Sequence, residues 1–314
     1  GSPFYPKPSS LWELAEDLNI TIFGTSAKFI AACQEAGVRP IENQDLNKMN
    51  SILSTGSPLV EENFDYIYND VKNDVMLSSI SGGTDLISCF ALGNPMLPVY
   101  RGEIQCRGLG MAVESFNLNG EYDINQKGEL VCKIAFPSMP IYFWNDEKGE
   151  KYYQAYFSTY PNIWHHGDYI LINDHGGIII YGRSDATLNP GGIRIGTAEI
   201  YRVVDKFSEV SDSLVVGQEW DEDERIILFI ILSANKKLTN GLINKIRLTI
   251  KKSCSPRHVP AKIIAIDDIP YTISGKKVEI AVKKIINGEK VKNKDALANP
   301  QSLKLYSNIK ELQQ

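Results

Sequence analysis

The sequence predicts a mixed α/β and α+β protein with two domains. The chain has 314 residues, about twice the roughly 150 residues of a typical domain. Hydrophobic residues make up 43% and charged residues 23%, which is a globular composition and excludes a disordered or fibrous chain. Short apolar runs alternate with Gly, Pro, Asn and Asp up to about residue 180, and the pattern changes after Gly182. We place the boundary in the polar, glycine-rich stretch 183–192, giving domains 1–184 and 185–314.

Apolar periodicity and β-branched runs predict the elements of the first domain. A β-branched run at 19–23 separates its first two helices. The expected elements are helices at 11–18, 27–36 and 64–74 and strands at 75–80, 99–106 and 128–134. The segments 169–173 and 178–181 predict a hairpin, because the turn Asp174-His175-Gly176-Gly177 contains residues that tolerate positive φ. The β-rich runs after residue 99 predict a small antiparallel sheet or barrel.

Three helices that alternate with three strands predict a smaller α+β unit for the second domain. The helices are expected at 198–207, 240–252 and 278–286, and the strands at 210–217, 225–232 and 262–266. The unit has about the most common size of a domain.

Charge and hydropathy exclude several classes of protein. Lys and Arg total 33 against 38 for Asp and Glu, so the net charge of -5 argues against a nucleic-acid partner held by bulk positive charge. The longest strongly apolar run, 226–232, is much shorter than the roughly 20 residues that span a bilayer. Five widely spaced cysteines indicate free thiols in a reducing compartment, so we expect a cytoplasmic protein. The start Gly1-Ser2-Pro3 has no leader, and we interpret it as a tag remnant or an internal cut.

The first candidate site follows the apolar run 75–80 and reads Ser79-Ile80-Ser81-Gly82-Gly83-Thr84-Asp85. Glycines at the end of a strand let backbone N–H groups approach an anion. Thr84 can donate to a phosphate oxygen, and Asp85 can hold Mg²⁺. The alternative for these residues is a tight turn in which Asp85 caps the next helix.

The second candidate site is Trp164-His165-His166-Gly167-Asp168, before the predicted hairpin. Asp168 could accept hydrogen bonds from a ribose diol, as the acidic residue of dinucleotide sites does. With His175, the two histidines also allow a zinc hydrolase as an alternative. We expect no zinc, because adjacent histidines on a strand point to opposite faces and no cysteine lies near them in sequence.

Three basic segments of the second domain are candidates for phosphate binding. Arg183 and Arg194 flank a segment rich in Gly, Pro and Asn, and the planar guanidinium donates two parallel hydrogen bonds to phosphate. Lys276 follows a flexible Ser-Gly pair, but the leading glycine of a P-loop is absent. Lys251 and Arg257 form a local basic patch. A solvated linker, a surface turn and a solvated helix end are the respective alternatives.

The order of these motifs resembles the adenylate-forming superfamily, which contains acyl-CoA synthetases and luciferases, and within it the acetoacetyl-CoA synthetases (acetoacetate–CoA ligases). The resemblance covers essentially the whole chain. It rests on Gly56-Ser57-Pro58, the glycine run at 82–83, the His-Gly-Asp of 166–168, the block 182–194, the segments 255–260 and 270–278, and the closing residues 299–306. It implies the C-terminal part of a large adenylating domain, with sheet and helix layers and a small β-barrel, followed by a mobile small α+β domain.

The resemblance also implies roles in binding ATP. The turn Gly56-Ser57-Pro58 and the strand end 79–84, with Ser81, Gly82, Gly83 and Thr84, would enclose adenine and the α-phosphate. Asp85 would stand at the position of the Mg²⁺-associated acid, where the family usually has Glu. Asp168 would accept from the ribose hydroxyls.

Further roles concern catalysis and CoA. Lys276 would be the adenylation lysine, Arg194 would neutralise phosphate charge and Arg183 would reach the ribose or phosphate. Asp185 would be the hinge of the second domain. The CoA residues would be Gly191 and Gly192, beside the pantetheine arm, and Lys251 and Arg257, which would hold the phosphates.

The resemblance implies the reaction of acetoacetate, ATP and CoA to acetoacetyl-CoA, AMP and pyrophosphate through an acyl-adenylate. The family's Ser/Thr/Gly-rich triphosphate loop does not occur before Gly56. We therefore expect the C-terminal half of a ligase, inactive without its N-terminal half. The alternatives are an acetate or short-chain acyl-CoA synthetase segment and a non-catalytic nucleotide- or CoA-binding module.

Overall fold

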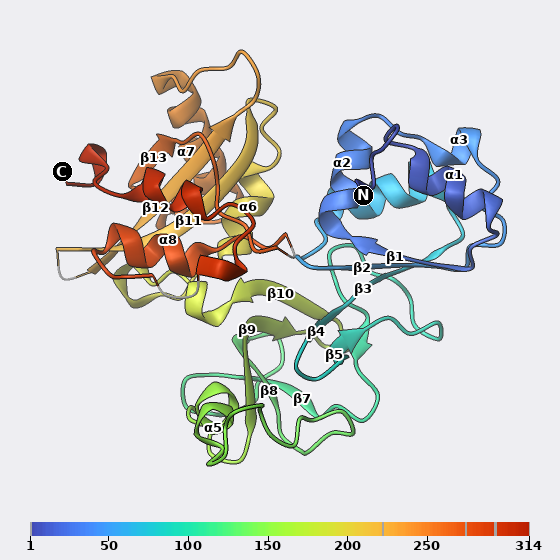
Figure 1. Cartoon of the computed structure of the whole chain (residues 1–314), viewed down its shortest axis with the longest axis horizontal. Helices are drawn as coiled ribbons and strands as arrows, with labels where there is room; N and C mark the ends of the chain where they lie inside the picture. Colours follow the sequence, from blue (N-terminus) through green and yellow to red (C-terminus); the bar gives the residue numbers. More distant parts are fainter. Residues whose placement is uncertain (1, 222, 274, 292–293, 314) are drawn as a thin grey trace. The chain divides into compact units, whose positions relative to one another are not determined.

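A computed structural model describes residues 2–221, 223–273, 275–291 and 294–313 of the chain (Figure 1). The chain folds into two compact units, Gly1–Ile180 and Tyr181–Gln314. The mixed α/β and α+β fold class predicted from the sequence is confirmed. In the described part of the chain, no helix has the length and apolar character that crossing a membrane requires.

The first unit begins with a parallel sheet of order β1-β2-β3 (Figure 1). The strands are β1 (Ile22–Ser26), β2 (Ser51–Thr55) and β3 (Met76–Ser79). The helices that accompany them are α1 (Ser10–Asp17), α2 (Ala27–Glu35), α3 (Pro40–Asn43) and α4 (Glu61–Tyr66), which continues as a π-helical turn, Ile67–Val71. Trp12, Ile30, Ile52 and Leu77 are fully or almost fully buried in their common core. The sheet positions the ends of β2 and β3, where two predicted site segments begin.

Two further sheets complete the first unit. One has the order β4-β5-β6 and the other the order β10-β9-β8-β7. The strands are β4 (Ser81–Gly83), β5 (Ser88–Leu92), β6 (Cys106–Arg107), β7 (Val113–Phe116), β8 (Lys127–Cys132), β9 (Trp164–Ile172) and β10 (Ile178–Arg183). The predicted hairpin is therefore confirmed as β9 and β10. The expected small barrel is not closed, because the described strands form these two open sheets. A shared core that includes Phe90, Leu130 and Trp164 packs them together.

Several sequence expectations for the first unit were incomplete or wrong. The segment 81–83 is the strand β4, paired antiparallel with β5, and the turn that was the alternative for this motif comes after it, at 84–87. Of the predicted strand 99–106, only Cys106 lies in a strand, as the first residue of β6, and Ile104 forms an isolated antiparallel bridge with Ile178. The sequence analysis missed β2, in which only two residues, Ile52 and Ser54, are buried. It also missed α5 (Glu150–Tyr156), none of whose residues is buried.

The second unit is a three-stranded sheet between helices (Figure 1). It contains α6 (Thr197–Val204), β11 (Val210–Trp220), β12 (Asp223–Leu232), α7 (Asn240–Ser253), β13 (Lys262–Ala265) and α8 (Glu279–Ile286). β12 pairs antiparallel with β11 and parallel with β13. Alternate residues of β11 enter different cores: Val215 packs with α6 and α7, and Leu214 packs with α8. This two-sided burial explains why the strands are apolar along most of their length.

Candidate functional site

In the first unit, strand pairing brings two of the predicted nucleotide segments together. Ser54 of β2 is in register with Ser79 of β3, and the Ile80 N–H donates to the Ser54 carbonyl oxygen over 2.9 Å. β2 is followed by Gly56, whose φ of 91° favours glycine, then by exposed Ser57 and half-buried Pro58. β3 is followed by Ser81 of β4. The turn 56–58 and the strand 81–83 therefore leave the same edge of the parallel sheet.

Glycine is required in β4 by close approach of other atoms. A Cβ on Gly82 would lie 2.0 Å from the carbonyl oxygen of Ser88, a separation that side chains do not tolerate. A Cβ on Gly83 would lie 3.0 Å from Cε1 of His166 and 3.4 Å from Leu86. The glycines thus permit both the pairing with β5 and the approach of the His166 ring.

His166 links β4 to Asp168. Alternation along β9 places Trp164, His166 and Asp168 on one face. The Trp164 Nε1–H donates to His166 Nδ1 over 3.4 Å, and His166 Nε2 lies 3.8 Å from Asp168 Oδ2. Asp168 is only 9% exposed. A buried carboxylate on the same strand face as the imidazole that packs on Gly83 is suitably placed to accept hydrogen bonds from a polar ligand near β4.

Thr84 and Asp85 follow β4 and are exposed. Asp85 accepts a hydrogen bond from the hydroxyl of Tyr156, the last residue of α5. The ring of Tyr156 stacks on Trp164 with 3.6 Å between centroids. Mg²⁺ is commonly held by one or two carboxylates together with substrate phosphates and water, so a single exposed carboxylate beside a phosphate site fits this ion. Among the described residues, no group of three or more His, Cys, Asp or Glu side chains forms a metal site.

The histidines proposed for the zinc alternative have separate partners. His165 Nε2 lies 2.9 Å from Glu129 Oε2, whereas His166 contacts Asp168 on the opposite face of β9. His175 Nε2 lies 2.8 Å from Glu103 Oε2. These separate pairs leave the zinc hydrolase without a common set of ligands in the described residues.

In the second unit, the predicted hinge residue follows β10. Arg183 Nε and Asp185 Oδ1 are 3.5 Å apart, and each side chain is about half exposed. The preceding Gly182 has a φ of 118°, and a Cβ there would lie 2.9 Å from Thr197 Oγ1 at the start of α6. Arg194 lies half-buried between the 3₁₀ turn Pro190–Gly192 and α6. Arg183 and Arg194 thus lie at the two ends of a loop, and both ends lie close to the start of α6.

Two of the predicted CoA residues are neighbours. A Cβ on Gly191 would lie 3.1 Å from Nη1 of Arg257, and the φ values of Gly191 and Gly192 are 59° and 76°. The Gly191 N–H donates to both carboxylate oxygens of Asp223, at 2.9 and 3.0 Å. Lys251 is exposed in the last turn of α7. The loop at 191–192 therefore has two charged neighbours. The Asp223 carboxylate binds its backbone, and the guanidinium of Arg257 lies beside Gly191.

Lys276 and its neighbour Lys277 have different environments. Lys276 is exposed in a short hairpin, where its N–H donates to Thr272 Oγ1 over 3.0 Å and its carbonyl oxygen accepts from the Thr272 N–H over 2.8 Å. Lys277 is partly buried, and its ammonium lies 3.0 Å from Asp212 Oδ1. Ser274 of the same motif lies outside the described residues. Of the two lysines, Lys276 has the side chain that a phosphate can reach.

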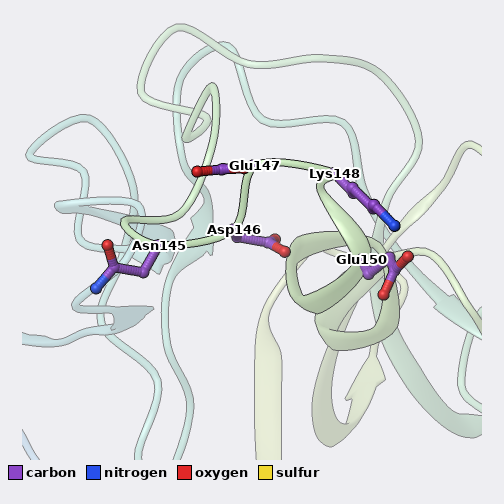
Figure 2. A pocket seen from close by; sticks show the side chains of 5 residues that line it. All are labelled: Asn145, Asp146, Glu147, Lys148 and Glu150. Atoms are coloured by element: carbon purple, nitrogen blue, oxygen red, sulfur yellow. The ribbon is translucent and has the colours of Figure 1, made fainter.

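A surface hollow beside α5 involves none of the predicted site residues. It is lined by Asn145, Asp146, Glu147, Lys148 and Glu150 beside α5 (Figure 2). Asp146 points toward the start of α5, where its carboxylate accepts from the backbone N–H groups of Lys151 and Tyr152. These hydrogen bonds lower the pKa of Asp146 against the opposing effect of burial. The side chains of Glu147 and Lys148 point away from each other, so we assign no ligand to this hollow.

The sequence analysis missed two residues that contact the candidate segments: Tyr156 binds Asp85, and Asp212 pairs with Lys277 beside Lys276. It named His166 as part of the second candidate site but did not predict that its ring lies between Gly83 and Asp168. Tyr156 and Asp212 are 71 and 65 residues from their partners, and no local pattern identifies them.

Known proteins are similar to this chain over nearly its whole length. No family model matches the chain. It is 53% identical over 312 residues to an acetoacetyl-coenzyme A synthetase of Rhizobium meliloti, covering 99% of this chain and 48% of that protein. It is 52% identical over 315 residues to an acetoacetyl-CoA synthetase of Danio rerio, covering 100% of this chain and 47% of that protein. The chain thus spans about half the length of the curated relatives that it matches.

Solved structures support the same relationship. An acetoacetyl-CoA synthetase from Streptomyces lividans superposes with a TM-score of 0.93 at 38% identity, covering 100% of this chain and 49% of that one. An anthranilate CoA ligase, AuaEII, superposes with a TM-score of 0.71 at 19% identity over 88% of this chain and 51% of its own. The second likeness concerns the fold alone.

Proposed function

The chain is a relative, along its whole length, of the C-terminal half of acetoacetyl-CoA synthetases, and we propose that it forms that half of an ATP-dependent acid–thiol ligase. The reaction is the conversion of acetoacetate, ATP and CoA to acetoacetyl-CoA, AMP and pyrophosphate through an acyl-adenylate. The observation that carries the proposal is the identity of about half of all residues over the whole chain, to relatives of this one activity.

The first half-reaction brings two anions together. A carboxylate attacks the α-phosphorus of ATP, and two unit charges about 4 Å apart repel by about 4 kcal/mol at an effective dielectric constant of 20. Lys276 and Arg194 supply positive charge that cancels this repulsion and stabilises the transition state. The exposure of Lys276 supports this role, because its ammonium is accessible to a ligand from another part of the enzyme.

The nucleotide binds at the strand ends of the first unit. Gly56, Ser57 and Pro58, together with the segment from Ser81 to Thr84, enclose adenine and the α-phosphate. Asp168 accepts hydrogen bonds from the ribose hydroxyls, and its burial on the strand face beside Gly83 supports this assignment. Asp85 holds Mg²⁺, which supplies positive charge beside the phosphates when it is bound.

The second half-reaction needs a different arrangement. The CoA thiol attacks the acyl-adenylate only after Lys276 has left the cleft, so 185–314 is a small mobile domain that turns at Asp185 while 1–184 belongs to the large adenylating domain. Arg183 reaches the ribose or phosphate. Gly191 and Gly192 leave room for the pantetheine arm, and Lys251 and Arg257 bind phosphate groups of CoA. The contact of Gly191 with Arg257 supports the grouping of the CoA residues.

The partner of this chain is the other half of the enzyme, and we propose that the enzyme acts in the cytoplasm. The triphosphate-binding loop of the superfamily is absent from these 314 residues. We therefore propose that the chain by itself releases little or no pyrophosphate. The alternative is a nucleotide- or CoA-binding module without catalysis, because the chain has the candidate ribose, hinge and lysine residues but not that loop.

Calorimetric titration of the chain with AMP and with CoA tests the binding part of the proposal. Asp168→Asn should weaken AMP binding at least about tenfold, consistent with the loss of roughly 1.4 kcal/mol from a charged hydrogen-bond acceptor. Lys276→Met should weaken it less, and exchange of the exposed Lys237 for Met is the matched control. If the chain binds neither ligand, or if Asp168→Asn binds AMP normally, the assigned nucleotide site is wrong.

Pyrophosphate release with acetoacetate and ATP tests the catalytic part. The isolated chain should show at most a trace of turnover, and the protein at the length of its relatives should show full turnover that Lys276→Met abolishes. Acetate in place of acetoacetate distinguishes the short-chain alternative. Binding of AMP and CoA without turnover at either length would favour the non-catalytic module.

A further inference from the structure

The hairpin that carries Lys276 consists of two antiparallel stems, and one residue pair closes its base. Tyr271 and Lys277 form an antiparallel bridge at its base. Above them, the Thr272 N–H donates to the Lys276 carbonyl oxygen over 2.8 Å, and the Lys276 N–H donates to Thr272 Oγ1 over 3.0 Å. The Gly275 N–H donates to the Thr272 carbonyl oxygen over 2.8 Å. The first stem is also paired with the segment 296–298, through a bridge between Thr272 and Leu297. The second stem, which carries Lys276, is held at its base by the contacts of Lys277.

Asp212 of β11 binds both of these base residues. The Tyr271 hydroxyl donates to Asp212 Oδ2 over 2.5 Å, and the Lys277 ammonium lies 3.0 Å from Asp212 Oδ1. Lys277 also donates to the carbonyl oxygen of Ser213, the next residue of β11. One carboxylate thus uses its two oxygens on the two opposite stems of the hairpin.

The environment makes these contacts stronger than surface ion pairs. The side chains of Lys277 and Asp212 are 21% and 22% exposed, and the Lys277 ammonium lies 4.2 Å from the centre of the Tyr201 ring. Burial, reinforced by the neighbouring carboxylate, raises the pKa of Tyr271, so that its phenol stays protonated and donates. Loss of Asp212 would leave an ammonium and a phenol without their shared acceptor in a poorly solvated place.

We propose that Asp212 is a positioning residue, which holds the hairpin so that Lys276 is presented in one orientation. Lys277 is its counterpart on the hairpin and does not itself reach the nucleotide. The importance of Asp212 for catalysis rests on the proposed role of Lys276. The anchoring of the hairpin by Asp212 does not depend on that role. β11 is paired with β12 in regular register from Asp212 to Trp220, after an irregularity between Val210 and Asp212. Asp212 thus begins the regularly paired part of the strand, which provides a firm base for the anchor.

Hydrogen exchange on this chain, followed by mass spectrometry, tests the anchor without substrate. In Asp212→Ala, the peptide containing the Thr272 and Lys276 amides should exchange at least about tenfold faster than in the unaltered chain. Asp212→Asn keeps an acceptor for Tyr271 and should recover part of the protection. Glu219→Gln, an exposed change on the same strand, is the matched control and should leave the exchange unchanged.

Amine labelling provides a second readout. Lys277 should react slowly with an acylating reagent in the unaltered chain and several-fold faster in both Asp212 variants, while Lys276 reacts readily in all of them. Unchanged exchange and unchanged Lys277 labelling in Asp212→Asn would overturn the proposal, even if Asp212→Ala failed to fold.

A functional readout separates this proposal from the one on which it rests. In the protein at the length of its relatives, Asp212→Asn should lower the rate of acyl-adenylate formation about tenfold without changing KM for ATP by more than about twofold. If Lys276→Met has no effect on that rate, the role of Lys276 is wrong. If Lys276→Met is inactive but Asp212→Asn is fully active, the positioning role of Asp212 is wrong.

Discussion

The imidazole of His166 packs directly against Gly83, at a distance where a Cβ on the glycine would lie 3.0 Å from Cε1 of the ring. The same ring lies 4.8 Å from the centre of Phe90 and 3.8 Å from Asp168 Oδ2. His166 therefore connects the glycine strand, the core and the proposed ribose carboxylate. A shift of the glycine strand toward the ring would therefore displace it.

Gly83→Ala should disturb this arrangement. The added methyl group pushes against the His166 ring and Leu86, and overpacking of this kind typically costs about 1–3 kcal/mol. We expect a loss of about 1 kcal/mol of unfolding free energy in urea, because the ring can shift. Gly24→Ala, in a strand position with open space around it, is the control. Equal stability of the two variants would contradict the packing, and weaker AMP binding by Gly83→Ala alone would link it to the site.

The hydrogen bond between Tyr156 and Asp85 should contribute to the stability of the first unit. Tyr156→Phe removes the hydroxyl but keeps the ring on Trp164, so we expect a loss of about 1 kcal/mol with little change in tryptophan fluorescence. Tyr153→Phe on the same helix, about half exposed, should change neither quantity. The result is checked by chemical denaturation. A stability equal to that of Tyr153→Phe would show that the hydrogen bond contributes nothing.

Glu279 should make the stability of the protein depend on pH. Burial raises its pKa in the folded state, although the Tyr201 hydroxyl at 3.0 Å and the charge of Lys277 favour the ionised form. The folded state then holds the proton more tightly than the unfolded state, so stability falls as pH rises from the unfolded pKa through the folded one. Glu279→Gln keeps an acceptor for Tyr201 and removes the titration.

Denaturation of the unaltered chain and of Glu279→Gln at several pH values tests this. Relative to the variant, the unaltered chain should lose stability as the pH rises above about 4.3, the ordinary pKa of a glutamate side chain. Titratable groups that are present in both proteins change both unfolding free energies equally, so their contributions cancel when the two free energies are subtracted. A difference that is constant with pH, or that grows in favour of the unaltered chain, would show that the carboxyl is not held in its neutral form.

Arg257 should contribute to CoA binding. Its guanidinium is exposed and lies against Gly191, so it can bind a phosphate group beside the glycine loop. Arg257→Gln should weaken CoA binding about tenfold at low salt and less at high salt, because exposed charges are screened. AMP binding should be unchanged. Lys237→Gln is the control, and equal loss of CoA affinity in both variants would indicate a general charge effect rather than a site.

The sequence predicted those elements whose pattern is local and repeated. Helices α1, α2, α6 and α7 lie where apolar periodicity placed them, to within a few residues, because a helix buries one face and repeats it every 3.6 residues. β2 and β4 were missed for a different reason. The first has few buried residues, and the second consists of Ser and two glycines, whose pairing depends on the Ser88 carbonyl approaching from β5.

The candidate site likewise contains residues that the sequence indicates and residues that it does not. The motifs that carry the resemblance are contiguous segments, so the candidate residues could be named from the sequence. Their supporting residues come from elsewhere in the chain: Tyr156 for Asp85, Asp223 for Gly191 and Asp212 for Lys277. Each of these contacts joins residues at least 32 positions apart, and no local pattern indicates such a pairing.

By itself the amino-acid sequence determined the fold class, most of the helices and the similarity to acetoacetyl-CoA synthetases, because these depend on periodicity and on short motifs in a set order. The tertiary structure decided which of two adjacent lysines is exposed and which is bound. Lys276 and Lys277 are equivalent in composition and propensity. Only the folded chain brings the Asp212 carboxylate within 3.0 Å of one of them, and charge pairing in a partly buried place then distinguishes the two.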